Sequence, residues 1–157
     1  MRTIQENFKN IFGQLNEFID AFNEEAHGMG SPSIPKQTVQ IVGQTALLLA
    51  DLPFPVTATM DLDVVSPLNY IVQKRLSELL LNEGMRLEND GHLIWMPQET
   101  LYQKILDFPS VEVFIALPEA VMASKLKFHR LKDQKLIQTY LKFFPEKEEE
   151  IRIQSKK

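Results

Sequence analysis

The sequence contains no cysteine, which excludes disulfide bonds, thiolate metal ligands and cysteine nucleophiles from the chemistry of this protein. It also has no apolar run that approaches the roughly 20 residues of a membrane-spanning helix. The first ten residues are polar and of mixed charge, unlike a secretory signal. These absences predict a soluble, cytoplasmic protein that has no membrane partner.

Several widespread catalytic motifs are missing as well. There is no Gly-x-Ser-x-Gly nucleophile elbow, and no glycine-rich loop is followed by Lys-Ser or Lys-Thr. The three histidines, His27, His92 and His129, are isolated and do not have the spacing of zinc ligands. The formal net charge of −4 shows no overall basic excess of the kind that nucleic-acid-binding domains carry. The sequence therefore gives no support to a P-loop NTPase, an α/β-hydrolase or a zinc enzyme.

The 157 residues, of which 44% are hydrophobic, suit a single globular domain. Residues 1–27 are predicted to form an amphipathic helix, because apolar side chains recur there every three or four residues. This apolar stripe consists of Phe8, Ile11, Phe12, Leu15, Phe18, Ile19 and Phe22. Residues 38–144 are the expected core of the domain, and residues 146–157 the expected charged tail.

The pattern of residues 38–144 predicts an α+β fold in which helices flank a mixed sheet. Strands are expected at residues 39–42, 60–65, 85–88, 93–96, 101–108 and 111–116. Helices are expected at residues 45–49, 69–83, 118–131 and 134–144. Asn89, Asp90 and Gly91 form a typical hairpin turn, which predicts that the strands on either side of it pair with each other.

Asp61 and Asp63 are the first candidate site residues. Side chains alternate along a strand, so both carboxylates are expected on the same face, with Cα atoms roughly 6.5 Å apart. Hard carboxylate oxygens at this spacing suit Mg²⁺ or Mn²⁺, including the two-metal sites of phosphoryl transfer. The alternative is a solvated sheet face, where such a pair of acids is common.

Gly43 and Gln44 form the second candidate feature, between the strand at 39–42 and the helix expected from Thr45. A glycine turn that leads into a helix N-terminus presents backbone N–H groups to an anion, and glycine lets a phosphate approach closely. The alternative is a glycine that serves turn geometry alone. Only one short helix and one turn separate Gly43 from Asp61, so the two features can meet at the same edge of the sheet.

The two features together resemble the minimal nucleotidyltransferase superfamily, and most closely its bacterial branch related to abortive-infection toxins. That branch typically has an apolar strand, Gly-Gly or Gly-Ser, Thr-Ala-Leu, and then Arg-x-Thr-x-Asp-apolar-Asp. Residues 41–49 and 59–65 match this pattern in part. Residues 118–126, followed by Lys132 and Asp133, are similar to the Pro-Glu helix start, helix lysine and Lys-Asp pair of the branch. The resemblance covers residues 38–144.

This resemblance implies a nucleotidyltransferase-like fold and a transfer of a nucleotidyl group from a nucleoside triphosphate to a hydroxyl acceptor, with release of pyrophosphate. Asp61 and Asp63 would bind Mg²⁺ or Mn²⁺. The implied nucleotide-binding residues are Gly43, Gln44, Thr45 and Lys125. The acceptor would be a nucleic acid, a protein or a small molecule. A toxin-antitoxin role would add an antitoxin partner, and a homo-oligomer is the other expected partner.

The sequence also departs from the pattern of the branch. Gln44 replaces the second glycine or serine, Thr57 replaces the arginine, and Leu136 lies near the place of a further aspartate. A third catalytic carboxylate is expected on a later strand, and the candidates are Asp107, Glu99 and Glu112. Asp107 is the first choice because it lies near the end of a predicted strand. These departures favour a second hypothesis, a catalytically silent binding domain of the same fold; a plain interaction module is the third.

Overall fold

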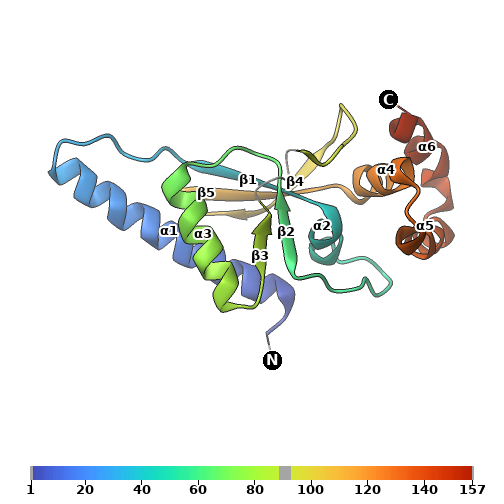
Figure 1. Ribbon diagram of the computed structural model, residues 1–157, viewed down its shortest axis with the longest axis horizontal. Coiled ribbons are helices and arrows are strands. Elements are labelled where there is room, and N and C mark those ends of the chain that lie inside the picture. The colour runs from blue at the N-terminus through green and yellow to red at the C-terminus, as the bar shows by residue number, and fades with distance from the viewer. Residues whose placement is uncertain (1, 89–92, 157) are drawn as a thin grey trace.

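The centre of the protein is a mixed five-stranded sheet with the strand order β3-β2-β1-β5-β4 (Figure 1). A computed structural model describes residues 2–88 and 93–156. The strands are β1 (Gln37–Val42), β2 (Asp61–Val64), β3 (Arg86–Glu88), β4 (Tyr102–Asp107) and β5 (Val111–Ala116). β1 is parallel to β5 and antiparallel to β2, β3 is parallel to β2, and β4 is antiparallel to β5. The expected α+β class with a mixed sheet is confirmed.

Helices flank this sheet in two groups. The helices are α1 (Ile4–Gly28), α2 (Gly43–Leu49), α3 (Tyr70–Asn82), α4 (Pro118–Phe128), α5 (Leu131–Phe143) and α6 (Glu148–Lys156), with a 3₁₀ turn at Pro145–Lys147. α1 and α3 pack against each other beside the sheet, whereas α4, α5 and α6 gather at the other end of the molecule (Figure 1). Among the described residues, no helix has the length and apolar character that crossing a bilayer requires.

α1 supplies much of the hydrophobic core, as its apolar spacing predicts. The side chains of Phe8, Phe12, Leu15 and Ile19 are at most 1% exposed. Burial of each such side chain stabilises the fold by roughly 1.5–3 kcal/mol. At the start of the helix, Thr3 accepts a hydrogen bond from the Glu6 backbone N–H and Glu6 accepts one from the Thr3 N–H, which forms a capping box.

The segments on either side of residues 89–91 do not pair with each other as the sequence predicted. β3 pairs in parallel with β2, and residues 93–96 do not form a strand. The turn itself lies outside the described residues. The physical reason is the helix α3, which carries the chain back across the sheet, so that β2, α3 and β3 form a parallel crossover unit.

The C-terminal segment is more ordered than the predicted charged tail. Most of it forms α6, which packs on α4 and has Ile151 at 1% exposure. An ion pair of 3.0 Å between Lys147 and Glu119 also joins this segment to α4. The break before α5 also comes earlier than expected, because His129 adopts a left-handed conformation with φ 49° and ends α4.

Candidate functional site

β2 presents its two aspartates on one face of the sheet, as strand alternation predicts. Leu62 and Val64 are buried in the core on the opposite face, at 0% and 7% exposure. Asp61 and Asp63 are only partly buried. The strand therefore places two carboxylates side by side at the surface, above a tightly packed apolar layer.

The carboxylate of Asp63 lies directly against Gly43. The antiparallel register pairs Val42 with Asp63, so the residue after Val42 passes close to the Asp63 side chain. A Cβ atom placed on Gly43 would come within 2.7 Å of Asp63 Oδ2, and Gly43 has φ +73°. The positive φ favours glycine at this position, because other residues rarely adopt it, and any side chain there would displace the Asp63 carboxylate. The expected meeting of residues 43, 61 and 63 at one place is confirmed.

Asp61 has a different neighbour, the guanidinium of Arg86 on β3. The parallel register places these residues next to each other, and Arg86 Nη2 donates to Asp61 Oδ1 over 3.2 Å. The side chain of Arg86 is 68% exposed and that of Asp61 is 40% exposed. One carboxylate of the pair is therefore already in contact with a cation, at the open side of the site.

Asp63 experiences an excess of negative charge. Burial raises the pKa of its carboxyl group, and the nearby charges of Glu88 and Asp61 raise this pKa further. The charges of Lys125 and Arg130 lower the pKa of the same group, but less than the other effects raise it. Glu88 lies beside Asp63 because β2 and β3 pair these residues in register. A cation that binds at Asp63 would relieve this repulsion.

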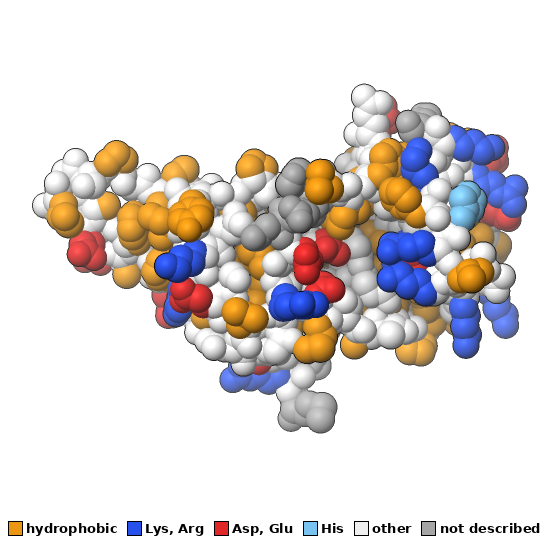
Figure 2. Space-filling view, viewed as in Figure 1, with side chains coloured by type: hydrophobic (Ala, Val, Ile, Leu, Met, Phe, Trp, Pro, Cys, Tyr) orange, Lys and Arg blue, Asp and Glu red, His pale blue; other side chains and the backbone are white. Residues whose placement is uncertain are grey.

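Lys125 and Arg130 are held in place by a buried carboxylate. Asp133 Oδ1 contacts Lys125 Nζ at 3.1 Å, and Asp133 Oδ2 lies 3.3 Å from Arg130 Nε. The side chains of Lys125 and Asp133 are only 9% and 6% exposed. Figure 2 shows acidic side chains over the β2 and β3 region, and Lys and Arg side chains over the α4 and α5 region, on the same face. Positive and negative groups thus flank one stretch of surface.

Gln44 and Thr45 have local structural partners. The Gln44 side-chain amide donates to the Thr57 carbonyl over 2.9 Å, and the Thr45 hydroxyl donates to the Asp61 carbonyl over 2.8 Å. Thr45 is 1% exposed. Both side chains tie α2 to the segment that leads into β2. The Thr45 hydroxyl therefore helps to position Asp61.

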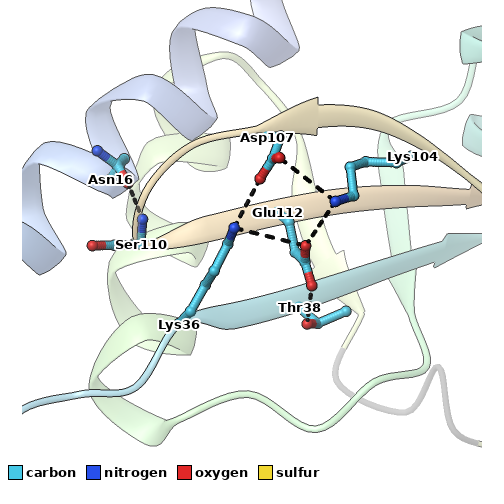
Figure 3. Close-up of polar contacts among 7 residues, drawn as sticks. All are labelled: Asn16, Lys36, Thr38, Lys104, Asp107, Ser110 and Glu112. Atoms are coloured by element: carbon cyan, nitrogen blue, oxygen red, sulfur yellow. Dashed lines mark hydrogen bonds and ion pairs between the residues drawn. The ribbon is translucent and has the colours of Figure 1, made fainter.

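The structure separates Asp107 from the aspartate pair. Figure 3 shows Asp107 beside Glu112, in a network with Lys36 and Lys104. β4 runs antiparallel to β5, which is parallel to β1, so the last residue of β4 lies level with the first half of β1. Gly43 follows the last residue of β1. Asp107 and Glu112 are therefore at the opposite end of the sheet from Gly43, and neither can act as the third acid there.

Glu99 is also away from the pair. It is exposed and lines a groove between the segment before β4 and α6, together with Glu146, Glu149 and Glu150. None of the three carboxylates considered from the sequence therefore joins Asp61 and Asp63.

Sequence reasoning missed three residues that do face the site: Arg86, Glu88 and Arg130. Arg86 and Glu88 became visible only through the parallel pairing of β3 with β2. A strand, a helix and a second strand in succession are typical of a parallel crossover, and this signal could have located them. Arg130 has no sequence signal beyond its place in a basic stretch.

The residues at the site fit a hard divalent cation bound by few protein ligands. The donors at Asp61 and Asp63 are carboxylate oxygens, which Mg²⁺ and Mn²⁺ prefer. Within residues 2–88 and 93–156, no three Asp, Glu or His side chains are arranged as a metal-binding set. Mg²⁺ is often bound by one or two carboxylates, with water and substrate phosphates as further ligands, so a pair of aspartates suffices.

Comparison with protein-family models, with curated proteins and with solved structures gave no match to this chain. Any function inferred for this protein therefore comes from the geometry of its own residues.

Proposed function

We propose that this protein is a metal-dependent nucleotidyltransferase, which transfers a nucleotidyl group from a nucleoside triphosphate to an acceptor hydroxyl. The observation that carries the proposal is the position of Asp63 between Gly43 on one side and the charges of Glu88 and Asp61 on the other. A phosphate can approach the backbone at Gly43 closely, and the excess of negative charge at Asp63 favours a bound cation. A metal ion bound to a polyphosphate would fit both features.

In this proposal, Asp61 and Asp63 hold Mg²⁺ or Mn²⁺. The metal would neutralise phosphate charge and polarise the phosphorus centre. Lys125 supplies a buried positive charge to the phosphate chain, and Arg130 supplies a second one that is 54% exposed. Asp133 keeps both cations in position. Because Gly43 has no side chain, the phosphates can approach the backbone beside Asp63.

The proposed reaction forms a bond between the acceptor oxygen and the α-phosphorus and breaks the bond from the α-phosphorus to the bridging oxygen of the β-phosphate. Pyrophosphate leaves with the electron pair of that bond. Glu88, which lies beside Asp63 in register, accepts the proton of the acceptor hydroxyl. In this proposal Glu88, and not Asp107, is the third carboxylate of the site. An acceptor must reach the site from the side of β3.

A catalytically silent binding domain is the second candidate, and specific contacts favour it. The Gln44 amide donates to the Thr57 carbonyl, and the Thr45 hydroxyl donates to the Asp61 carbonyl, so the Thr45 hydroxyl proton and one of the two Gln44 N–H donors are already engaged. The proposed enzyme therefore has fewer phosphate donors in this turn than the resemblance implies. In the silent protein, nucleotide and metal would bind without any transfer.

The decisive experiment incubates the purified protein with labelled nucleoside triphosphates, Mg²⁺ or Mn²⁺ and a mixture of RNA, protein and small-molecule acceptors. Transfer of label is expected for the wild type, with a decrease of about a hundredfold or more for Asp63→Asn, because the metal ion that would stabilise the transition-state charge loses a ligand. Asp107→Asn is the matched control, since it also removes one carboxylate but at the other end of the sheet, and it should transfer label normally.

Each other outcome has a clear meaning. Binding of a labelled triphosphate without transfer in either metal would support the silent domain. If the wild type binds neither metal nor triphosphate, the proposed function is wrong and a plain interaction module remains.

A further inference from the structure

Arg86 is the cation that contacts the aspartate pair from the side of β3. Its Nη2 atom makes one hydrogen bond of 3.2 Å to Asp61 Oδ1, and the side chain is 68% exposed. Among the described residues, Asp61 is the only carboxylate that Arg86 contacts. The remaining donors of the guanidinium group are therefore available to another anion on the same face.

The contact between Arg86 and Asp61 is suited to exchange. Exposed ion pairs contribute little stability, and this one uses a single nitrogen rather than the two parallel hydrogen bonds of a bidentate pair. Arginine does not lose its proton in proteins, so its charge leaves Asp61 only if the side chain moves. Metal binding at Asp61 favours such a movement, because the metal ion and the guanidinium are both positively charged and would lie on the same carboxylate.

The other cations of the site are held more firmly. Lys125 and Arg130 are both paired with the buried carboxylate of Asp133. Arg86 approaches the aspartates from the neighbouring strand β3, whereas Lys125 lies on α4 and Arg130 lies directly before α5. An anion above Asp61 and Asp63 would therefore have positive charges on two sides, of which only the β3 side can readily change partners.

Building on the proposed function, we propose that Arg86 is a nucleotide-binding residue that exchanges partners during substrate binding. In the absence of substrate, it neutralises Asp61. When a metal ion binds Asp61, the guanidinium moves to a phosphate oxygen of the nucleoside triphosphate. Arg86 consequently opposes binding of the metal alone and favours binding of the triphosphate, so its removal has opposite effects on the two affinities.

The test measures two affinities of the full chain: for Mn²⁺ without nucleotide, and for a non-hydrolysable triphosphate with Mn²⁺. Arg86→Ala should bind Mn²⁺ about two- to fivefold more tightly, because an exposed competing ion pair is lost. The same variant should bind the triphosphate about tenfold more weakly, the usual effect of losing a hydrogen bond to a charged group. Arg86→Lys should recover part of the triphosphate affinity, because it keeps the charge but not the fork of donors.

Arg152→Ala is the matched control, because Arg152 is 64% exposed and forms a comparable ion pair with Glu148 on α6. It should change neither affinity. Unchanged affinities in Arg86→Ala, or affinities that move in the same direction, would overturn the role of Arg86 and leave the proposed function intact. If the wild type fails to bind both Mn²⁺ and the triphosphate, the proposed function and this inference fail together. Thermal unfolding of each variant establishes that the compared proteins are folded.

Discussion

The Asp63 carboxylate and Gly43 are in such close contact that any Cβ atom at position 43 would lie 2.7 Å from Asp63 Oδ2. The two residues come from different elements, β2 and the first turn of α2, and the β1–β2 register brings them together. A side chain at position 43 would therefore displace this carboxylate.

Gly43→Ala is expected to disturb binding more than stability. The alanine must adopt φ +73°, which costs about 1–2 kcal/mol, and the Asp63 carboxylate must rotate away. Mn²⁺ affinity should fall as a result, measured by calorimetry. Gly30→Ala is the control, because Gly30 has φ +69° and no atom within 4 Å of its added Cβ. It should lose similar stability and keep Mn²⁺ affinity. Normal Mn²⁺ binding by Gly43→Ala would contradict the role of this contact.

Asp63→Asn should stabilise the fold at neutral pH. The raised pKa of Asp63 means that its charged form is less favourable in the folded state than in the unfolded state. Wild-type stability therefore decreases as the pH rises from the ordinary carboxyl pKa through the raised one. The asparagine variant has no such decrease, so its advantage should be absent in acid and appear above that window. We expect a gain of about 0.5–1 kcal/mol at pH 7, reduced by partial exposure.

Urea unfolding at several pH values measures this gain. Glu112→Gln provides a comparison of opposite sign, because hydrogen bonds from Thr38 and Lys104 lower the pKa of Glu112. That variant should be less stable than the wild type at neutral pH. If Asp63→Asn is also less stable at neutral pH, then burial of the Asp63 carboxylate and its repulsion by Glu88 and Asp61 do not dominate its contribution to stability.

Part of this site could be predicted from the sequence, because it depends on local geometry. Strand alternation alone places Asp61 and Asp63 on one face. A glycine between a strand and a helix predicts a close approach, although not which side chain approaches. The Phe stripe of α1 similarly fixes its buried face, because the helical period is independent of the rest of the fold.

The remainder depends on strand order and direction, which local patterns do not specify. The Asn-Asp-Gly sequence after Glu88 suggested a hairpin, whereas the crossover through α3 pairs Glu88 with Asp63. Asp107 is the last residue of β4, but β4 is antiparallel to β5. Asp107 therefore lies at the end of the sheet that is away from Gly43. The hairpin and the position of Asp107 were wrongly predicted for the same reason. The partner and the direction of a strand are determined by long-range pairing, which local sequence patterns do not specify.

Lys125 and Asp133 should behave as one energetic unit. Because both side chains are less than 10% exposed, Asp133→Asn leaves a buried ammonium without its carboxylate, at a cost of about 3 kcal/mol. Lys125→Met should recover part of this loss when combined with Asp133→Asn, since no buried charge is then left at position 125. A double-mutant cycle by urea unfolding should give a coupling energy of at least about 1 kcal/mol. Additive losses would show that the two charges do not depend on each other.

Asp107→Asn should alter the acid dependence of stability and leave the site unaffected. Hydrogen bonding to Lys36 and the charge of Lys104 lower the pKa of Asp107 in the folded state. The stability that this carboxylate contributes is therefore present above the ordinary carboxyl pKa of about 4 and is lost as the pH falls through the lowered value. The variant should be less stable than the wild type at neutral pH, and the difference should shrink in acid.

Melting temperatures measured from pH 7 down to about pH 3 test this prediction. The Mn²⁺ affinity of the variant, measured in parallel, should equal that of the wild type. A loss of Mn²⁺ affinity would mean that the two ends of the sheet are coupled, contrary to their separation along β1.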